Sequence, residues 1–220
     1  MTDFALARRN MVDGQLRPNR VTNLALLTAI GDLPRERFLP DKLKSIAYSD
    51  EDVPLGNGRF LMEPMVLGRL IQTLQPKPES RAMVVASGRG YGTAVLARLT
   101  RSVVAVESDP AMAGAAEQTI KSLGLGNVTH VVGPPESGAP ATAPYDIILI
   151  EGAVREIPQT ILGQLAEGGR LCTIVVAGAP GTLGVAQLVV REGGVTSGRP
   201  LFEAGTPLLP GFTPPARFTF

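Results

Sequence analysis

The chain has 220 residues, of which 44% are hydrophobic and 19% are charged, with a formal net charge of +1. This composition argues against long disorder, and the near-zero charge argues against a general attraction to nucleic acid or to an anionic membrane. One cysteine and one histidine exclude an internal disulfide and a zinc site built from such ligands. We expect a single compact domain in the cytoplasm, without nucleic-acid or membrane partners, in which Cys172 and His130 are structural residues of strands.

The first 80 residues are predicted to be mainly helical. Apolar residues at helical spacing predict helices over residues 7–16 and 23–34. Residues 48–64 are expected to be irregular, because proline and glycine recur there. A third helix is predicted to begin at Pro64 and to end before Pro76, since proline is favoured in a first helical turn and stops a helix just beyond its end.

The remaining residues alternate short β-branched runs with helical patterns, which predicts a parallel sheet covered by helices on both faces. The expected strands are residues 82–86, 102–107, 127–132, 145–152 and 169–178. The expected helices are residues 91–99, 110–123 and 158–166. Residues 184–205 are predicted to form two antiparallel strands around a glycine turn, and residues 216–220 are expected to add an edge strand.

The turn after the first of these strands, "ASGRG" (Ala86–Gly90), predicts a cofactor site. Open parallel sheets bind ligands at the carboxyl ends of their strands, where glycines let a ligand approach the backbone. The next strand ends in Glu107, where a carboxylate can accept hydrogen bonds from both ribose hydroxyls. The pattern indicates an adenosine-containing cofactor, and by itself leaves both a dinucleotide and S-adenosylmethionine open.

Five blocks of sequence identify a family. They are "RRNMVDGQL" (8–16), "LPRERFLP" (33–40), "AYSDEDVPLG" (47–56), "AMVVASGRGYGTAVLA" (82–97) and the run from "APYDIILIEG" to "GGRLC" (143–172). In content and order they resemble the protein-L-isoaspartate O-methyltransferase family along almost the whole chain. An NAD-type dehydrogenase on a similar sheet is disfavoured, because the N-terminal and C-terminal blocks match the methyltransferases.

The resemblance implies an α/β fold with a doubly wound, mostly parallel, seven-stranded methyltransferase (Rossmann-like) sheet. Helices would cover both faces, and an antiparallel strand pair would follow at the C-terminal end. Residues 1–80 would form added helices that cover the substrate. Residues 81–220 would form the S-adenosylmethionine-binding core, with both segments in one compact domain.

The activity implied by the resemblance is methyl transfer from S-adenosylmethionine to the α-carboxylate of an isoaspartyl residue in a damaged protein or peptide. A carboxylate is already ionised at neutral pH, so no general base is needed and no catalytic residue is assigned. The alternative is a divergent member that has lost isoaspartyl methylation. Such a protein would act as a binding or regulatory protein, or methylate another acceptor.

The cofactor site departs from the family pattern at three places. Val84 stands where the family has an acidic residue that helps hold the methionine end, and Ala86 stands where it has a glycine. Pro134 and Pro135 replace the aspartate and its neighbour in a "GDG" loop, so neither a carboxylate nor an N–H donor is available for the adenine edge. We therefore expect weakened cofactor binding. The candidate cofactor-binding residues are Ala86, Ser87, Gly88, Arg89, Gly90, Glu107, Gly133, Pro134 and Glu151.

Several polar residues near this site have two interpretations each. Glu151 ends a strand where the family has a small or neutral residue, and would bind a cation or a hydroxylated substrate, or else pair with Arg155. Ser87, Arg89 and Glu136 are candidates to replace the lost polar contacts. The alternative for Arg89 and Glu136 is a solvated loop charge.

The segment "GRFLMEP" matches the family's substrate loop "GQTISQP". Met62 replaces its serine and Phe60 its threonine, so we expect a less polar pocket. The candidate substrate-binding residues are Arg59, Phe60, Leu61, Met62, Glu63 and Pro64.

Overall fold

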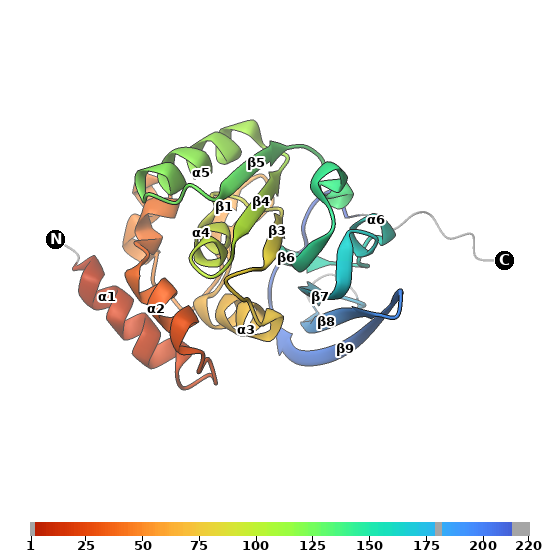
Figure 1. Ribbon diagram of the computed structural model, residues 1–220. Helices are drawn as coiled ribbons and strands as arrows, with labels where there is room; N and C mark the ends of the chain where they lie inside the picture. The colour runs from red at the N-terminus through yellow and green to blue at the C-terminus, as the bar shows by residue number, and fades with distance from the viewer. Residues whose placement is uncertain (1–2, 179–181, 213–220) are drawn as a thin grey trace.

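The computed structural model describes residues 3–178 and 182–212, and its centre is a seven-stranded sheet in the order β5-β4-β3-β6-β7-β8-β9 (Figure 1). The first five strands in this order run parallel, and β8 and β9 are antiparallel. The predicted mostly parallel sheet with an antiparallel C-terminal pair is therefore confirmed. The edge strand expected at 216–220 lies outside the described residues. The bounds are β3 (Arg81–Val85), β4 (Ser102–Glu107), β5 (Val128–Val132), β6 (Tyr145–Val154), β7 (Leu165–Val175), β8 (Gly184–Glu192) and β9 (Val195–Ala204).

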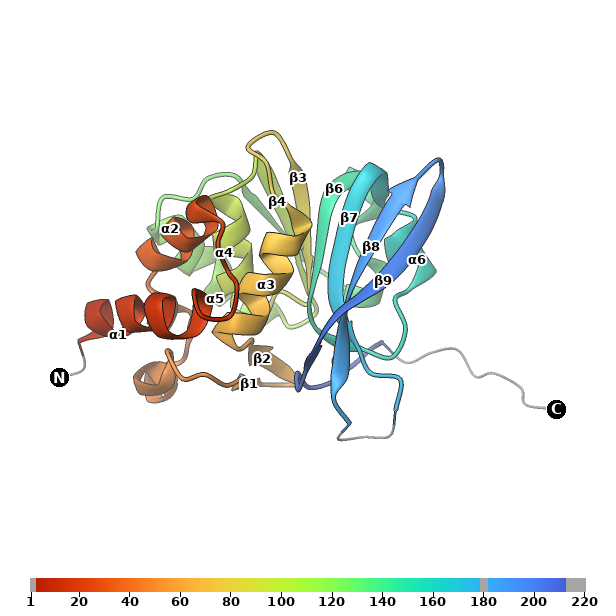
Figure 2. The same cartoon turned by 90° about the horizontal axis from the view of Figure 1, so that it is seen from below.

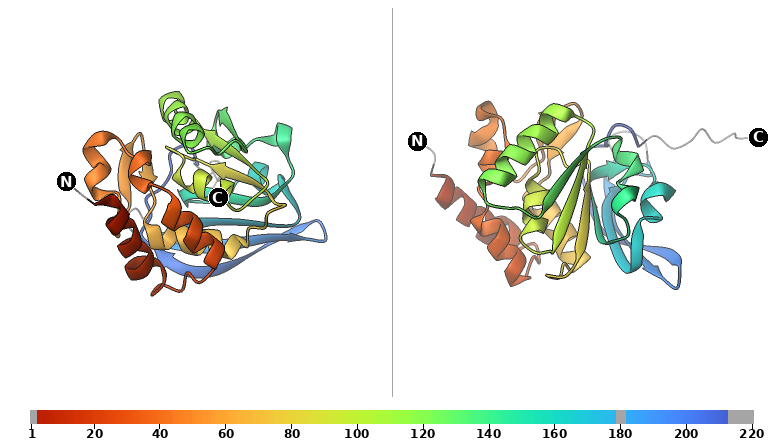
Figure 3. Two further views of the ribbon diagram at one scale, coloured as in Figure 1. Left: turned by 60° about the vertical axis from the view of Figure 1, so that its left-hand side comes forward. Right: turned by 45° about the horizontal axis from the view of Figure 1, so that its top comes forward.

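Helices lie on both faces of the sheet, as expected. Figure 2 shows α1 to α4 gathered on one side and α6 on the other, and Figure 3 shows α5 running beside β5. The first helix continues as a short π-helix over Val12–Leu16. The bounds are α1 (Phe4–Met11), α2 (Leu24–Asp32), α3 (Pro64–Leu74), α4 (Tyr91–Ala97), α5 (Pro110–Ser122) and α6 (Gln159–Leu162).

Alternation along β3 explains how one strand serves two hydrophobic layers. Val84 faces the layer that holds α3 and α4, whereas Val85 faces the layer that holds α6. Both side chains are fully buried, as expected for a central strand of a parallel sheet. The first layer extends from Leu16 near the N-terminus to Ile174 on β7, so residues before and after the boundary at 80 share one core.

Two expectations about local structure are wrong. Residues 48–64 contain a hairpin of β1 (Val53–Gly56) and β2 (Arg59–Leu61), where irregular chain was expected. Its turn is Asn57-Gly58, with φ of 50° and 68°, a pair suited to the twist of a two-residue hairpin. The range expected for the next helix, 158–166, is also too long. The observed helix α6 ends at Leu162, and β7 begins at Leu165.

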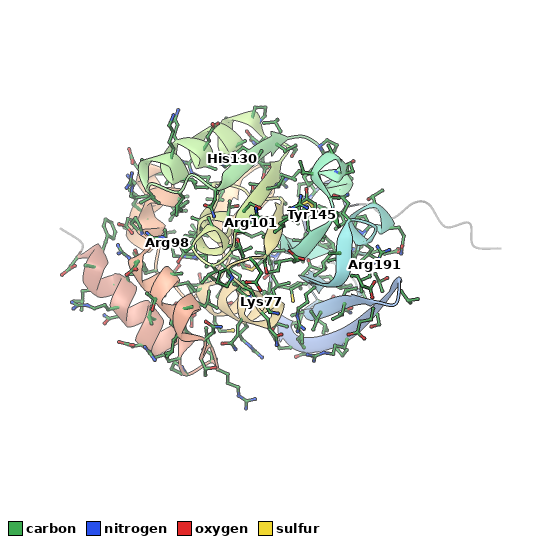
Figure 4. The ribbon with its side chains drawn as sticks, in the orientation of Figure 1. Lys77, Arg98, Arg101, His130, Tyr145 and Arg191 are labelled. Atoms are coloured by element: carbon green, nitrogen blue, oxygen red, sulfur yellow. The ribbon has the colours of Figure 1, made fainter. Side chains whose placement is uncertain are left out.

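Cys172 and His130 occupy strand positions, as expected. Cys172 is fully buried in β7, and burial raises the pKa of its thiol to about 12, so the thiol stays protonated at neutral pH. His130 lies on the edge strand β5 (Figure 4), where desolvation lowers its pKa. Over residues 3–178 and 182–212, no group of three His, Cys, Asp or Glu side chains is arranged to hold a metal ion. No helix in the same ranges is long and apolar enough to cross a bilayer.

The start of α5 gives a test of the fold. The Asp109 carboxylate accepts hydrogen bonds from the N–H groups of Ala111 and Met112 at 2.8 and 3.1 Å, and Pro110 occupies the first helical position. We expect Asp109→Ala to lower the free energy of unfolding by about 1 kcal/mol, the usual loss of an N-cap, and Asp109→Asn to lose much less. Urea unfolding of both variants measures this. Equal destabilisation by the two substitutions would contradict the capping role.

Candidate functional site

The candidate site lies where the carboxyl ends of β3, β4 and β6 meet. The turn after β3 carries Ala86, Gly88 and Gly90 with φ of 57°, 54° and 88°. Ala86 adopts a left-handed conformation, which an L-residue with a side chain adopts only at a cost. A Cβ on Gly90 would lie 3.0 Å from the Cβ of Ala116, so glycine also allows α5 to pack closely. The turn thus lies between a central strand and the helix that begins at Tyr91, as the sequence predicted.

Glu107, the last residue of β4, is buried and bonded within the protein. Its Oε2 atom accepts hydrogen bonds from Nε of Arg59 at 3.0 Å and from the N–H of Gly88 at 2.8 Å. Its Oε1 atom accepts from the N–H groups of Ser108 and Asp109 at 2.7 and 3.0 Å. The carboxylate predicted to receive ribose hydroxyls is thus fully engaged by protein donors.

The predicted substrate loop divides between three environments. Arg59, with only 2% of its surface exposed, points to the end of β4 and forms an ion pair with Glu107. Leu61 and Met62 are buried in the hydrophobic core, and Pro64 is buried at the start of α3. Of the six predicted residues, Phe60 and Glu63 keep exposed surface. Arg59 thus lies beside Glu107 at the end of β4.

A second polar cluster surrounds Arg35, which the sequence analysis did not single out. Arg35 is fully buried, donates to the carbonyls of Ala47 and Met62 at 2.7 and 2.6 Å, and its guanidinium lies 4.7 Å from the centre of the Tyr91 ring. These contacts fix the substrate loop to the N-terminal segment. The only signal in the sequence was the position of Arg35 within the "LPRERFLP" block.

Glu151 joins this cluster from within β6, which continues to Val154, so the expectation that Glu151 ends the strand is wrong. Its carboxylate lies against Gly92 of α4, where an added Cβ would be 2.7 Å from Oε2. Burial raises the pKa of Glu151 to about 8, although the charge of Arg35 and the N–H of Gly92 oppose the shift. The suggested pairing with Arg155 is wrong, because that guanidinium donates to the carbonyls of Val176 and Gly178.

A cavity of about 240 Å³ opens beside Glu107. It is lined by Arg59, Asp109, the two prolines after β5 and the C-terminal Pro210–Gly211. This volume is below the range of about 300–1,000 Å³ that is usual for small-molecule sites. As expected, Pro134 and Pro135 offer no N–H donor to this cavity.

Arg89 and Glu136 have contacts of their own. The Nε atom of Arg89 donates to the carbonyl of Phe38 at 3.1 Å, so this side chain joins the turn to the N-terminal segment. Glu136 lines the cavity, and its Oε2 atom lies 3.1 Å from the position of a Cβ on Gly211. Glu136 therefore lines the cavity, whereas Arg89 contacts the N-terminal segment.

The C-terminal segment closes the same edge of the sheet. The N–H of Leu209 donates to the carbonyl of Ala153 at 2.8 Å, and the N–H of Ala153 donates to the carbonyl of Pro207 at 3.2 Å. Leu209 and Phe212 are 6% exposed and pack in the same hydrophobic layer as Val85. Residues distant in sequence therefore cover the strand ends.

Comparison with known proteins supports the resemblance to the methyltransferase family that the sequence blocks indicated. The family model described as Protein-L-isoaspartate(D-aspartate) O-methyltransferase (PCMT) matches residues 7–197. The chain belongs to the protein-L-isoaspartate O-methyltransferase family. It is 36% identical over 170 residues to protein-L-isoaspartate O-methyltransferase 1 of Rhodopseudomonas palustris (strain HaA2), covering 77% of this chain and 69% of the relative. It is 36% identical over 202 residues to the Methylorubrum extorquens (strain PA1) protein-L-isoaspartate O-methyltransferase, covering 92% and 85%.

Solved structures show the same fold as this member of the isoaspartate O-methyltransferase family. One protein-L-isoaspartate O-methyltransferase has a TM-score of 0.78 at 24% identity, over 90% of this chain and 64% of that one. A putative protein-L-isoaspartate O-methyltransferase from Plasmodium falciparum, in complex with S-adenosyl-L-homocysteine, has a TM-score of 0.76 at 19% identity, over 96% and 100% of the two chains. The predicted methyltransferase fold is confirmed.

The raised pKa of Glu151 predicts a pH dependence of stability. The folded state holds a proton between the ordinary carboxyl pKa of 4.5 and about 8, whereas the unfolded state has released it, so stability falls as pH rises through this window. Glu151→Gln should remove a slope of up to about 1.4 kcal/mol per pH unit. Urea unfolding of both proteins from pH 5 to 8 measures the difference. Burial also raises the pKa of Glu63, to about 7. Its effect on the pH dependence of stability is the same in both proteins and cancels in the difference between them. Parallel curves for the two proteins would contradict this prediction.

Proposed function

We propose that this protein is an S-adenosylmethionine-dependent methyltransferase that acts on the carboxylate of isoaspartyl residues in damaged proteins. The observation that carries the proposal is the family match over residues 7–197, which includes both the N-terminal segment and the carboxyl ends of the strands. The sheet and the glycine turn of this family are both present.

The backbone of the turn after β3 is suited to bind the cofactor. Gly88 and Gly90 adopt left-handed backbone conformations in this turn, and the Oγ atom of Ser87 is buried without a hydrogen-bond partner among the described residues. A buried hydroxyl without a partner favours a polar ligand beside it. We assign the adenosine to this turn and to Glu107, and when bound the cofactor supplies an electrophilic methyl group on its sulfonium.

Glu151 is suited to take over the role of the acidic residue that Val84 has replaced. Val84 of β3 pairs with Leu149 of β6, and Glu151 follows two residues later on the face covered by α4. The carboxyl group has thus moved from one strand to its neighbour, into space left free by Gly92. There it would bind the ammonium group of the cofactor's methionine end.

The N-terminal segment would supply the substrate side. Arg35 anchors the loop through Met62, and the exposed parts of Phe60 and Glu63 would contact the peptide. The attacking carboxylate is ionised at neutral pH, so these residues need only position it and exclude water. No proton has to be moved by a side chain.

A binding protein without methyl transfer is the second candidate. The observation that favours it is the full engagement of Glu107 by Arg59 and backbone donors. Such a protein would keep the fold and use the N-terminal segment to hold a partner. Absence of S-adenosylhomocysteine binding at millimolar concentration would support this candidate over the enzyme.

The proposed activity predicts selectivity for one carboxylate. We expect the protein to transfer labelled methyl groups to an isoaspartyl peptide. The same peptide with a normal aspartyl residue should stay unlabelled, because the site must align the α-carboxylate that only the isoaspartyl residue offers. Release of base-labile methyl ester from the two peptides measures this. No incorporation into the isoaspartyl peptide at millimolar cofactor would refute the proposal.

The proposed role of Glu151 predicts which ligands depend on it. Above the pKa of Glu151, about 8, where the carboxylate is ionised, Glu151→Gln should weaken S-adenosylhomocysteine binding roughly tenfold or more, because a charged hydrogen bond contributes about 1.5–3 kcal/mol. Binding of methylthioadenosine, which lacks the amino-acid end, should stay unchanged. Calorimetric titration measures both, with Glu117→Gln on the exposed face of α5 as a control. Equal weakening of both ligands would contradict the assignment.

A further inference from the structure

The hairpin β1–β2 covers the cofactor side of the site with side chains. A Cβ placed on Gly88 would lie 3.3 Å from Cδ1 of Leu55, so the space opened by this glycine is occupied from the hairpin. At the hairpin turn, Nδ2 of Asn57 donates to the carboxylate of Asp109 at 2.6 Å. The hairpin forms its own two-stranded sheet, separate from the main sheet. It is therefore held over the strand ends by such contacts and not by strand pairing.

Arg59 makes the hairpin contact that matters most for a ligand. An ionised carboxylate offers about four acceptor positions. At Glu107 these positions receive Arg59, Gly88, Ser108 and Asp109, all within 3.0 Å. A ribose hydroxyl can bond to this carboxylate only if one of these donors leaves.

A fifth, longer contact to Glu107 comes from Oγ of Ser108 at 3.3 Å. The four donors within 3.0 Å differ in how easily they can leave. Three are backbone N–H groups, of the glycine turn and of the residues that lead into α5, and their positions are set by the fold. The fourth is the side chain of Arg59, whose second contact is with Oγ of Ser108 at 3.0 Å. Its Nη1 atom is buried without a hydrogen-bond partner among the described residues. Arg59 is thus the donor that a ligand can displace.

The displacement opposes binding for two reasons. A hydrogen bond from a charged guanidinium to a carboxylate is stronger than one from a neutral hydroxyl. The ion pair is also almost completely shielded from water, with 3% and 1% of the two side chains exposed, so salt and solvent screen it little. The ribose would therefore exchange a stronger partner of Glu107 for a weaker one.

We propose that Arg59 competes with the ribose of the cofactor for Glu107, so that adenosine binds only after this side chain leaves and the hairpin shifts. The inference rests on the proposed function, because it takes S-adenosylmethionine as the ligand. Arg59 stands where the family's loop has glutamine, which lacks the charge needed for such a pair. The residue thereby sets the cofactor affinity of this chain.

The direct test compares Arg59→Gln with the unmodified protein in calorimetric titrations with S-adenosylhomocysteine. We expect the variant to bind at least tenfold more tightly. Arg37→Gln is the matched control, because it removes an arginine of the N-terminal segment that contacts Ser122 on α5 and lies outside the cavity. Circular dichroism checks that each variant is folded. If Arg59→Gln does not fold, Asn57→Ala loosens the same hairpin at its turn and should raise the affinity severalfold.

A second pair of probes locates the competition at the ribose. Arg59→Gln should improve binding of adenosine by the same factor as that of S-adenosylhomocysteine. It should leave binding of 2′,3′-dideoxyadenosine unchanged, because that probe lacks the 2′ and 3′ hydroxyls that would bond to Glu107. An equal gain for all three ligands would overturn the proposed competition and indicate a general loosening of the hairpin.

The outcomes separate this inference from the proposed function. Equal or weaker binding of S-adenosylhomocysteine by Arg59→Gln overturns the competition, while binding by the unmodified protein leaves the proposed function standing. Binding by the variant alone supports both. Absence of binding by every protein at millimolar ligand overturns the proposed function and the competition together.

Discussion

The buried ion pair between Arg59 and Glu107 joins the hairpin β1–β2 to the end of β4, and the form of the candidate site depends on it. Removing one member of a buried pair leaves the other charge without compensation, so the contact stabilises the hairpin in its place. The same contact occupies the carboxylate that we propose binds the ribose of the cofactor. Under the proposed competition, the stability of the hairpin position and the affinity for the cofactor are opposed at Arg59.

Charge has also been redistributed at the other end of the site. Val84 on β3 stands where the family pattern has an acidic residue, and we propose that Glu151 on β6, which lies against Gly92, takes over its role. Arg35 places a positive charge near this carboxyl group and partly offsets its burial. The two substitutions are compatible with each other, because neighbouring parallel strands reach the same edge of the sheet. A side chain on one strand can therefore replace a side chain on the other.

Three segments distant in sequence enclose this edge of the sheet. The N-terminal segment contributes Arg35, the hairpin contributes Leu55 and Arg59, and the C-terminal segment contributes Leu209. Each segment is anchored mainly through contacts with backbone groups or with the strand ends.

The sequence by itself determined the sheet, the glycine turn, the strand-end carboxylate Glu107 and the family, because each depends on local periodicity or on short motifs. It also contained the Asn57-Gly58 signal of the hairpin, although the surrounding prolines and glycines favoured an irregular interpretation. The tertiary structure alone decided that Arg59 pairs with Glu107 and that Glu151 meets Gly92 and not Arg155. The physical reason is that such partners come from elements far apart in the chain. Their meeting is set by how strands and helices stack, which no spacing in the sequence expresses.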